Sequence, residues 1–198
     1  MSNDYTVTLK GHVLEYLDDT HTYIVDGVLV PSVSQLIAFK FPDKFKFVDK
    51  EVLRISAEKG TAVHEAIERY CKTGEDSDLP ELTNFKFLQK HYKFEVLENE
   101  QPITIFQDDI PVAVGRLDMV IRIDGKIGGA DIKRTATLDK QSLLYQLNLY
   151  RIGFRQCYGV EWEFLKAIHL KDDVRKFVDV PINEDIAWDL INEYRSTI

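Results

Sequence analysis

The dipeptide Asp124-Gly125 constrains this chain more than any other feature of its sequence. An Asp-Gly pair between two apolar segments predicts a β-hairpin with a two-residue turn. With that turn, Ile123 pairs with Lys126, and counting outward places Asp118 opposite Asp131. Directly opposed residues have Cβ atoms about 5 Å apart, and like charges there destabilise a sheet. Folding alone therefore gives no reason for the carboxylate pair that this hairpin predicts.

A lysine accompanies the two carboxylates. Strand alternation places Lys133 on the same face as Asp131. Two carboxylates suit a hard divalent ion such as Mg²⁺ or Mn²⁺. Together with a nearby lysine, they are the groups used in metal-assisted hydrolysis of a phosphodiester. The alternative is a solvated pair of aspartates and an ordinary salt bridge from Lys133. The apolar run 127–130 argues against a solvated face, although a bulge at Gly128-Gly129 would shift the register by one residue.

Composition and charge limit the class of protein. A length of 198 residues is typical of one domain, so we expect a single domain over 1–198. No apolar run approaches the roughly 20 residues of a membrane span, and the N-terminus does not read as a signal peptide. The two cysteines, Cys71 and Cys157, favour a reducing, cytoplasmic setting. A net charge of −8 argues against tight unassisted binding of nucleic acid.

Periodicity and turn residues predict an α/β (mixed α+β) fold, with a central mixed sheet flanked by helices. Besides the central hairpin, we expect strands at 12–17, 103–107, 161–170 and 175–181, and in 21–30, which has a second turn at Asp26-Gly27. We expect helices at 34–39, 56–72, 81–97, 141–158 and 184–194. Gly159 is a plausible C-cap. The N-terminal hairpin and helical segment, 1–59, would pack on a core formed by 60–198.

Polar residues outside the hairpin are further candidates for a site. His64 lies on a predicted helix, where a lone histidine is more often structural or merely exposed. Gln146 and Tyr150 are one helical turn apart and share a face, which is also common for an ordinary polar pair on a helix surface. Glu100 precedes the strand that leads to Asp118, and a solvated loop acid is its alternative interpretation.

Taken together, these residues form a pattern. In chain order the motifs are Gly-x-x-x-His at 60–64, an upstream Glu, Gly-x-x-Asp at 115–118, Asp-x-Lys at 131–133 and Gln-x-x-x-Tyr at 146–150. In this order they resemble the RecB-type branch of the PD-(D/E)xK nuclease superfamily, over about Gly60 to Tyr150. More loosely, His21-Thr22-Tyr23, Gly27 and 31–34 are similar to the opening of phage-encoded and mitochondrial single-strand DNA exonucleases of that branch.

The resemblance implies a restriction-endonuclease-like core and a role for each residue. The resemblance implies one or two ions of Mg²⁺ or Mn²⁺, held by His64, Asp118, Asp131 and the main-chain carbonyl of Ile132. Glu100 is a further implied ligand, although Glu98 competes with it for that role. Lys133 matches the catalytic lysine, and Gln146 and Tyr150 match the helix that orders the site and contacts DNA. Two cysteines exclude the iron–sulfur cluster of some relatives. Arg134 departs from the family, which usually has a threonine or serine there.

The function implied by the resemblance is that of a metal-dependent DNA exonuclease. It would hydrolyse linear DNA in recombination, repair or replication, in the cytoplasm of a bacterial or phage-infected cell. The same site could serve a structure-specific or restriction-type endonuclease. A third alternative is a non-catalytic nuclease-fold DNA-binding subunit, although such a subunit would not need Lys133.

The expected partner is DNA, as a single strand or the end of a duplex. We do not expect the protein to bind a membrane. The acidic charge favours help from a single-strand annealing or binding protein. Segment 39–59 mixes four phenylalanines, all before residue 48, with lysines and an arginine. They form either a basic, aromatic wall on which bases stack, or an amphipathic segment with its phenylalanines in the core.

Overall fold

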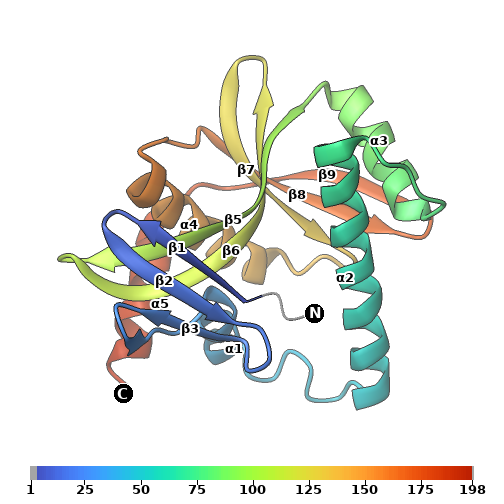
Figure 1. The fold of residues 1–198 in the computed structure, drawn as a ribbon. Helices are drawn as coiled ribbons and strands as arrows, with labels where there is room; N and C mark the ends of the chain where they lie inside the picture. The colour runs from blue at the N-terminus through green and yellow to red at the C-terminus, as the bar shows by residue number, and fades with distance from the viewer. Residues whose placement is uncertain (1–3, 198) are drawn as a thin grey trace.

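The computed structural model describes residues 4–197, which form two β-sheets with helices packed around the larger one (Figure 1). The strands are β1 (Tyr5–Leu9), β2 (His12–Leu17), β3 (Thr22–Val25), β4 (Val28–Leu29), β5 (Glu95–Gln107), β6 (Ile110–Ile123), β7 (Lys126–Lys133), β8 (Phe164–Lys171) and β9 (Val174–Val180). The helices are α1 (Val33–Lys40), α2 (Lys50–Thr73), α3 (Pro80–Tyr92), α4 (Lys140–Tyr158) and α5 (Glu184–Arg195).

The larger sheet is mixed, with the strand order β5-β6-β7-β8-β9. Only β7 and β8 run parallel, because α4 crosses over between them, whereas the other neighbours are antiparallel and joined by tight turns. Successive side chains of a strand point to opposite faces. Met119 and Ile121 accordingly pack with α2 and α3, and Val120 packs with α4. The predicted mixed sheet flanked by helices is confirmed.

The smaller sheet has the order β1-β2-β3-β4 and packs against β6. Its apolar side chains, among them Leu14 and Val25, form a cluster with Val114 of β6. The chain then passes directly along β6, where the Val114 amide donates to the carbonyl of Pro31 at 3.0 Å. This contact anchors the start of α1, whose N-cap Ser32 forms a capping box with Gln35.

Helix boundaries differ most from expectation before β5. The predicted helix 81–97 ends at Tyr92, because Lys93 adopts the left-handed conformation (φ 54°) and terminates α3. The strand expected at 103–107 instead begins at Glu95, since nearly its whole length pairs with β6. The helix expected from residue 56 begins at Lys50, where Asp49 caps the Glu51 and Val52 amides. Strand β1 was not among the predicted elements.

Helix α4 begins in a tightly bonded cap. The Asp139 carboxylate accepts hydrogen bonds from the Ser142 amide at 3.0 Å and the Ser142 hydroxyl at 2.7 Å, and it lies 3.0 Å from Nζ of Lys44. Burial by itself raises the pKa of this carboxyl. The Ser142 hydrogen bonds and the Lys44 ammonium outweigh burial and lower the pKa to about 2.

Replacing this cap should destabilise the protein in a pH-dependent way. Asp139→Ala is expected to lower the free energy of unfolding by about 1 kcal/mol at neutral pH. Because the folded-state pKa lies below the ordinary value, the contribution is present above about pH 4 and is lost as the pH falls toward 2. Urea unfolding at several pH values measures it. Asp49→Ala is the matched control, because that exposed cap accepts only from two amides, whereas Asp139 also binds the Ser142 hydroxyl and Lys44. A smaller loss of stability for Asp139→Ala than for Asp49→Ala would contradict the prediction.

Candidate metal centre

The central hairpin has the predicted two-residue turn and no bulge. Asp124 and Gly125 have φ values of 49° and 82°, and the strand pairs run without a shift from Ile123–Lys126 to Met119–Ala130. The next positions outward are Asp118 and Asp131, as predicted. The ladder ends before them, since Oδ2 of Asp118 accepts a hydrogen bond from the Ile132 amide at 2.6 Å.

Gly128 and Gly129 of β7 allow close packing of a neighbouring segment and do not form a bulge. A Cβ atom on Gly128 would lie 2.4 Å from the carbonyl oxygen of Phe164, and one on Gly129 would lie 2.0 Å from the ring of Trp162. Both neighbours belong to the segment that enters β8 beside β7. The glycines therefore let the chain after α4 approach β7 closely.

Glu100 lies opposite Asp118 on the neighbouring strand. The pairs Asn99–Met119 and Gln101–Leu117 place it there. Its φ of 53° is in the left-handed region, and every other described non-glycine residue with positive φ lies in a turn or at a helix end. Such a conformation costs on the order of 1–3 kcal/mol and is concentrated at functional sites. Glu98, the competing candidate, is exposed and bonded to Gln101.

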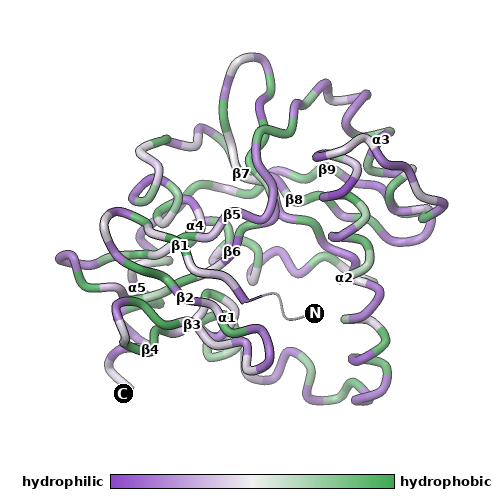
Figure 2. The backbone as a smooth tube through the Cα atoms, in the orientation of Figure 1, coloured by the Kyte–Doolittle hydropathy of each residue, from purple (hydrophilic) through white to green (hydrophobic). Residues whose placement is uncertain are grey.

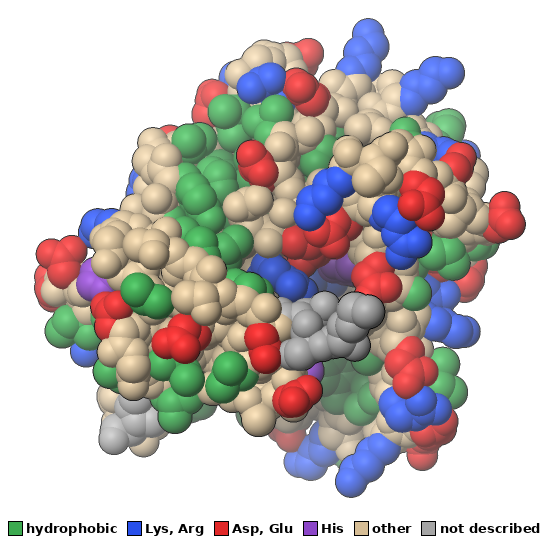
Figure 3. All heavy atoms as spheres, viewed as in Figure 1, with side chains coloured by type: hydrophobic (Ala, Val, Ile, Leu, Met, Phe, Trp, Pro, Cys, Tyr) green, Lys and Arg blue, Asp and Glu red, His purple; other side chains and the backbone are tan. Residues whose placement is uncertain are grey.

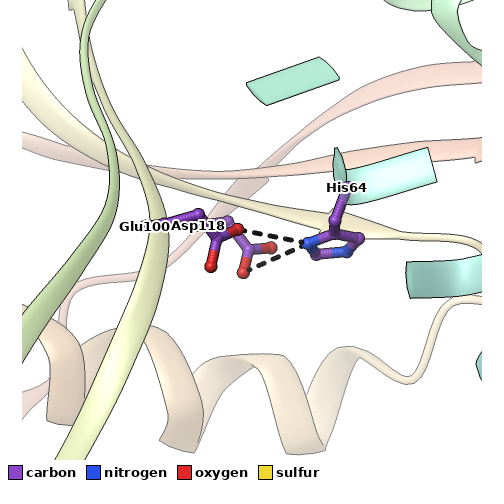
Figure 4. Close-up of side chains that lie close together, drawn as sticks. All are labelled: His64, Glu100 and Asp118. Atoms are coloured by element: carbon purple, nitrogen blue, oxygen red, sulfur yellow. Dashed lines mark ion pairs between the residues drawn. The ribbon is translucent and has the colours of Figure 1, made fainter. Parts of the chain in front are cut away.

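His64 of α2 points at both of these carboxylates (Figure 4). Its Nδ1 lies 3.7 Å from Oε1 of Glu100 and 3.6 Å from Oδ1 of Asp118. One ligand atom of each residue can be chosen so that all three lie within 4.8 Å of one another. Imidazole nitrogen and carboxylate oxygen both bind divalent ions such as Mn²⁺. The sequence-predicted residues His64, Glu100 and Asp118 are thus brought together.

The carbonyl of Ile132 lies on another side of the imidazole ring. It is 3.3 Å from Nε2 of His64, and because a carbonyl can only accept, Nε2 must be the donor. That bond leaves Nδ1 directed at Glu100 and Asp118. In this arrangement the Ile132 carbonyl orients the histidine. Its role as a metal ligand stays a prediction.

The charge around His64 strongly favours a cation. Burial by itself lowers the pKa of the imidazole, but Asp118 and Glu100 outweigh burial and raise it to about 9. The ring is therefore protonated at neutral pH, with its Nδ1 proton facing two carboxylates. The same position would suit a divalent ion, whose binding would displace that proton.

Asp131 is buried next to Lys133 and stands outside the group of three. It is 1% exposed, and Nζ of Lys133 lies 2.7 Å from its Oδ2. Among the described residues neither of its oxygens accepts a well-formed hydrogen bond. Burial, and then the charge of Asp118, raise the pKa of Asp131 to about 6 against the opposing effect of Lys133. Burial lowers the pKa of Lys133, but Asp131 and Asp118 raise it more, so the ammonium stays charged.

Arg116 is a neighbour of the site that the motifs do not include. Its Nε lies 2.8 Å from Oε2 of Glu100, so that carboxylate bridges an arginine and His64. Strand alternation was the signal that could have found it, because Arg116 shares a strand face with Asp118. The arginine neutralises part of the acidic charge and holds Glu100 in place.

Gln146 and Tyr150 lie below the hairpin on α4. Nε2 of Gln146 donates to the Tyr150 hydroxyl at 3.4 Å. Burial, reinforced by the charge of Asp118, raises the pKa of Tyr150, so the phenol remains protonated. Its ring fills the space beside Gly115, where a Cβ atom would lie 2.8 Å from the ring. The Gly of the Gly-x-x-Asp motif is therefore needed for Tyr150 to reach the site.

Arg134 turns toward α3. Its Nε lies 2.6 Å from Oε1 of Glu81, a buried residue, and its Nη2 lies 3.3 Å from Asp172. The guanidinium is thus occupied by two carboxylates beside the site. This structural role accounts for an arginine at a position where the resemblance predicts a threonine or serine.

Comparisons with known proteins add little to this geometry. No protein-family model matches the sequence, and no curated protein matches it. Among the solved structures that match is one described as "Crystal structure of SSO0001". It is 17% identical, with a TM-score of 0.49, and the match covers 85% of this chain and 76% of that chain. A likeness at this level carries no functional argument. Within residues 4–197, no helix is long and apolar enough to cross a membrane.

Proposed function

We propose that the protein is a metal-dependent deoxyribonuclease of the PD-(D/E)xK type, an exonuclease that hydrolyses linear DNA in recombination, repair or replication. One observation carries the proposal. His64, Glu100 and Asp118 come from three separate elements and meet beside a buried Asp131–Lys133 pair. Two or more acids, a histidine and a lysine are the groups that the resemblance requires, and folding alone would not crowd like charges in this way.

The side chains fit a divalent cation. The ligand atoms of His64, Glu100 and Asp118 are close enough to share one ion. Among the described residues Lys133 pairs with Oδ2 of Asp131, and Oδ1 has neither a hydrogen-bond nor an ion-pair partner. A buried carboxylate is costly unless a cation or hydrogen bonds satisfy it. His64, Asp118 and Asp131 would hold Mg²⁺ or Mn²⁺, with Glu100 as a further ligand. The main-chain carbonyl of Ile132, which accepts a hydrogen bond from Nε2 of His64, is the remaining ligand that the resemblance implies.

The remaining groups would act on the substrate. A bound divalent ion would polarise the scissile phosphate and lower the pKa of a bound water. Lys133, kept charged by Asp131 and Asp118, would stabilise the negative charge that develops on the phosphate oxygens. Tyr150 and Gln146, bonded to each other beneath the hairpin, would hold these groups in position.

A cleavage assay tests this function. End-labelled linear DNA and covalently closed circular DNA, each single- and double-stranded, are incubated with Mg²⁺, Mn²⁺ or EDTA. We expect linear DNA alone to be degraded, only with metal, and not by Asp118→Ala. Nicking of closed circles would identify an endonuclease. Binding without cleavage in either metal would identify a non-catalytic DNA-binding subunit.

Two glutamates of β5 offer a matched pair of variants for the same assay. Glu100→Gln removes a carboxylate that faces His64 and should reduce cleavage by at least about tenfold. Glu98→Gln changes an exposed carboxylate two residues away and should leave cleavage unchanged. Equal rates for both variants would exclude Glu100 from the site.

A further inference from the structure

A large groove leads to the candidate metal centre. Its volume is about 1480 Å³, and it lies between the first half of α2, the segment 41–48, the first turns of α4 and the chain that follows β7. Lys133 and Gln146 line one part of it. In Figure 3 the molecule is hollowed between the helix α2 and the main body, with basic side chains visible inside. The groove is therefore continuous with the site described above.

The outer wall of the groove is built from residues that the core does not use. From Lys50 to Lys59 every residue of α2 except Leu53 is exposed, although Val52 and Ile55 are apolar and line the groove. Apolar residues are visible in this part of the helix in Figure 2, at the lower right. A helix half with so little burial derives little stability from packing. Val52 and Ile55 belong to none of the three hydrophobic clusters of the described residues.

The phenylalanines of segment 39–59 divide into two groups. Phe39 and Phe41 are partly buried, and Phe41 meets the Tyr145 ring edge-on with centroids 5.7 Å apart. Phe45 and Phe47 are instead 53% and 92% exposed. The interpretation that these phenylalanines all enter the core is wrong, because the loop carries Phe45 and Phe47 into solvent. Phe45 lines the groove, and Phe47 is not part of the lining but lies between Lys46 and Val48, which are.

The charge of the groove is opposite to that of the protein. Six lysines and arginines line it against three aspartates, on a chain with a net charge of −8. Several of these cations have partners, for example Lys44 with Asp139. Within the described residues, Lys59 and Lys171 have no ion-pair partner, which leaves two cations free at the groove. A polyanion is the ligand that this charge fits.

We propose that the groove binds single-stranded nucleic acid and guides it to the metal centre. Bases would stack on Phe45 in the lining of the groove and on Phe47 beside that lining, and Lys59 and Lys171 would bind phosphates. Exposed aromatic rings alternating with lysines suit a single strand, whose bases offer their faces, whereas a duplex hides those faces in its own stack. The proposal rests on the proposed function, and it adds the strand preference and the path of the substrate.

Binding without cleavage tests this path. Anisotropy is measured for a labelled oligo(dT) and for a blunt hairpin duplex, in Ca²⁺, with a gel to show that both probes stay intact. The double variant Phe45→Ala/Phe47→Ala should bind oligo(dT) at least about fivefold more weakly, the lower end for one lost base stack. Phe87→Ala is the matched control, because Phe87 is 45% exposed on α3 and lies outside the groove.

A charge reversal provides a second, independent variant. Lys59→Glu should weaken binding of oligo(dT) and reduce its salt dependence, because a phosphate contact releases counterions. Lys126→Glu, at the tip of the central hairpin, should change neither. Both variants alter exposed side chains, so a failure to fold is not expected.

The outcomes separate this proposal from the proposed function. Unchanged oligo(dT) binding by the groove variants, or wild-type binding of duplex as tight as that of oligo(dT), overturns the groove proposal even if metal-dependent cleavage is observed. Groove-dependent binding in a protein that cleaves nothing supports the groove proposal and overturns the nuclease. An oligomer that dissociates in Phe45→Ala/Phe47→Ala, with unchanged DNA affinity, would assign the patch to contact between copies and overturn the groove proposal.

Discussion

Asp131→Asn should abolish DNA cleavage and, at neutral pH, make the metal-free protein more stable. The Asp131 carboxylate is 1% exposed, lacks a well-formed hydrogen bond and lies near the charge of Asp118. Nζ of Lys133 lies 2.7 Å away, but burial outweighs its attraction, so the ionised carboxylate still costs folding free energy. The amide keeps the shape and removes this charge, and Asp118 remains as a counter-charge for Lys133. The same change removes a proposed metal ligand, so cleavage should fall by at least about a hundredfold.

The pH dependence of this stabilisation has a definite sign. Burial raises the pKa of Asp131 to about 6 in the folded protein, so the folded state holds its proton more tightly than the unfolded chain. The destabilising charge is therefore absent at about pH 4 and fully present above pH 6. The gain in melting temperature from Asp131→Asn should appear above pH 6 and shrink toward pH 4.

Thermal unfolding with and without Mn²⁺ measures both parts of the prediction. Mn²⁺ at about 100 times its dissociation constant should stabilise the wild type by about 2.7 kcal/mol and the variant much less. Asp179→Asn is a suitable control, because its side chain is 83% exposed and pairs with Lys166 at the surface. A variant that is less stable than wild type at pH 7, or that keeps its full response to Mn²⁺, would contradict this role for Asp131.

Gly129→Ala should be among the most damaging single-methyl additions in the protein. The new Cβ would lie 2.0 Å from the ring of Trp162, which is 1% exposed and packed against Phe154. Because the ring is enclosed, β7 and the entry to β8 must separate. Overpacking of this kind costs about 1–3 kcal/mol and sometimes more. We expect the upper end of that range in urea unfolding followed by circular dichroism.

Gly60→Ala is the matched comparison. Gly60 lies within α2, where an added Cβ would meet nothing within 4 Å. Alanine is favoured over glycine inside a helix by about 0.8–1 kcal/mol, so this variant should be more stable than wild type. If Gly129→Ala unfolded at the wild-type urea concentration, Trp162 would be free to move and the glycine would need another explanation.

Local rules were sufficient for the central hairpin. Asp124-Gly125 selects a two-residue turn, and the period of two in a strand then carries the register outward to Asp118 and Asp131. The helix α4 and its C-cap Gly159 also followed from short-range patterns, because periodicity and capping act within a few residues. The same rules missed the Asp49 cap of α2 and ended α3 too late, since neither boundary carries a strong apolar period.

Contacts between distant segments determined the rest of the site. The choice of Glu100 over Glu98 depends on the pairing of β5 with β6 and on a left-handed residue that no propensity would place inside a strand. Likewise, the need for the two glycines of β7 depends on the close approach of Phe164 to Gly128 and of Trp162 to Gly129. Both contacts come from a segment more than 30 residues further along the chain. Turn chemistry and periodicity therefore predicted where Asp118 and Asp131 stand on their strands. Packing between elements far apart in the chain brought His64 and Glu100 to Asp118 and left Asp131 with Lys133, because those distances depend on how whole elements stack.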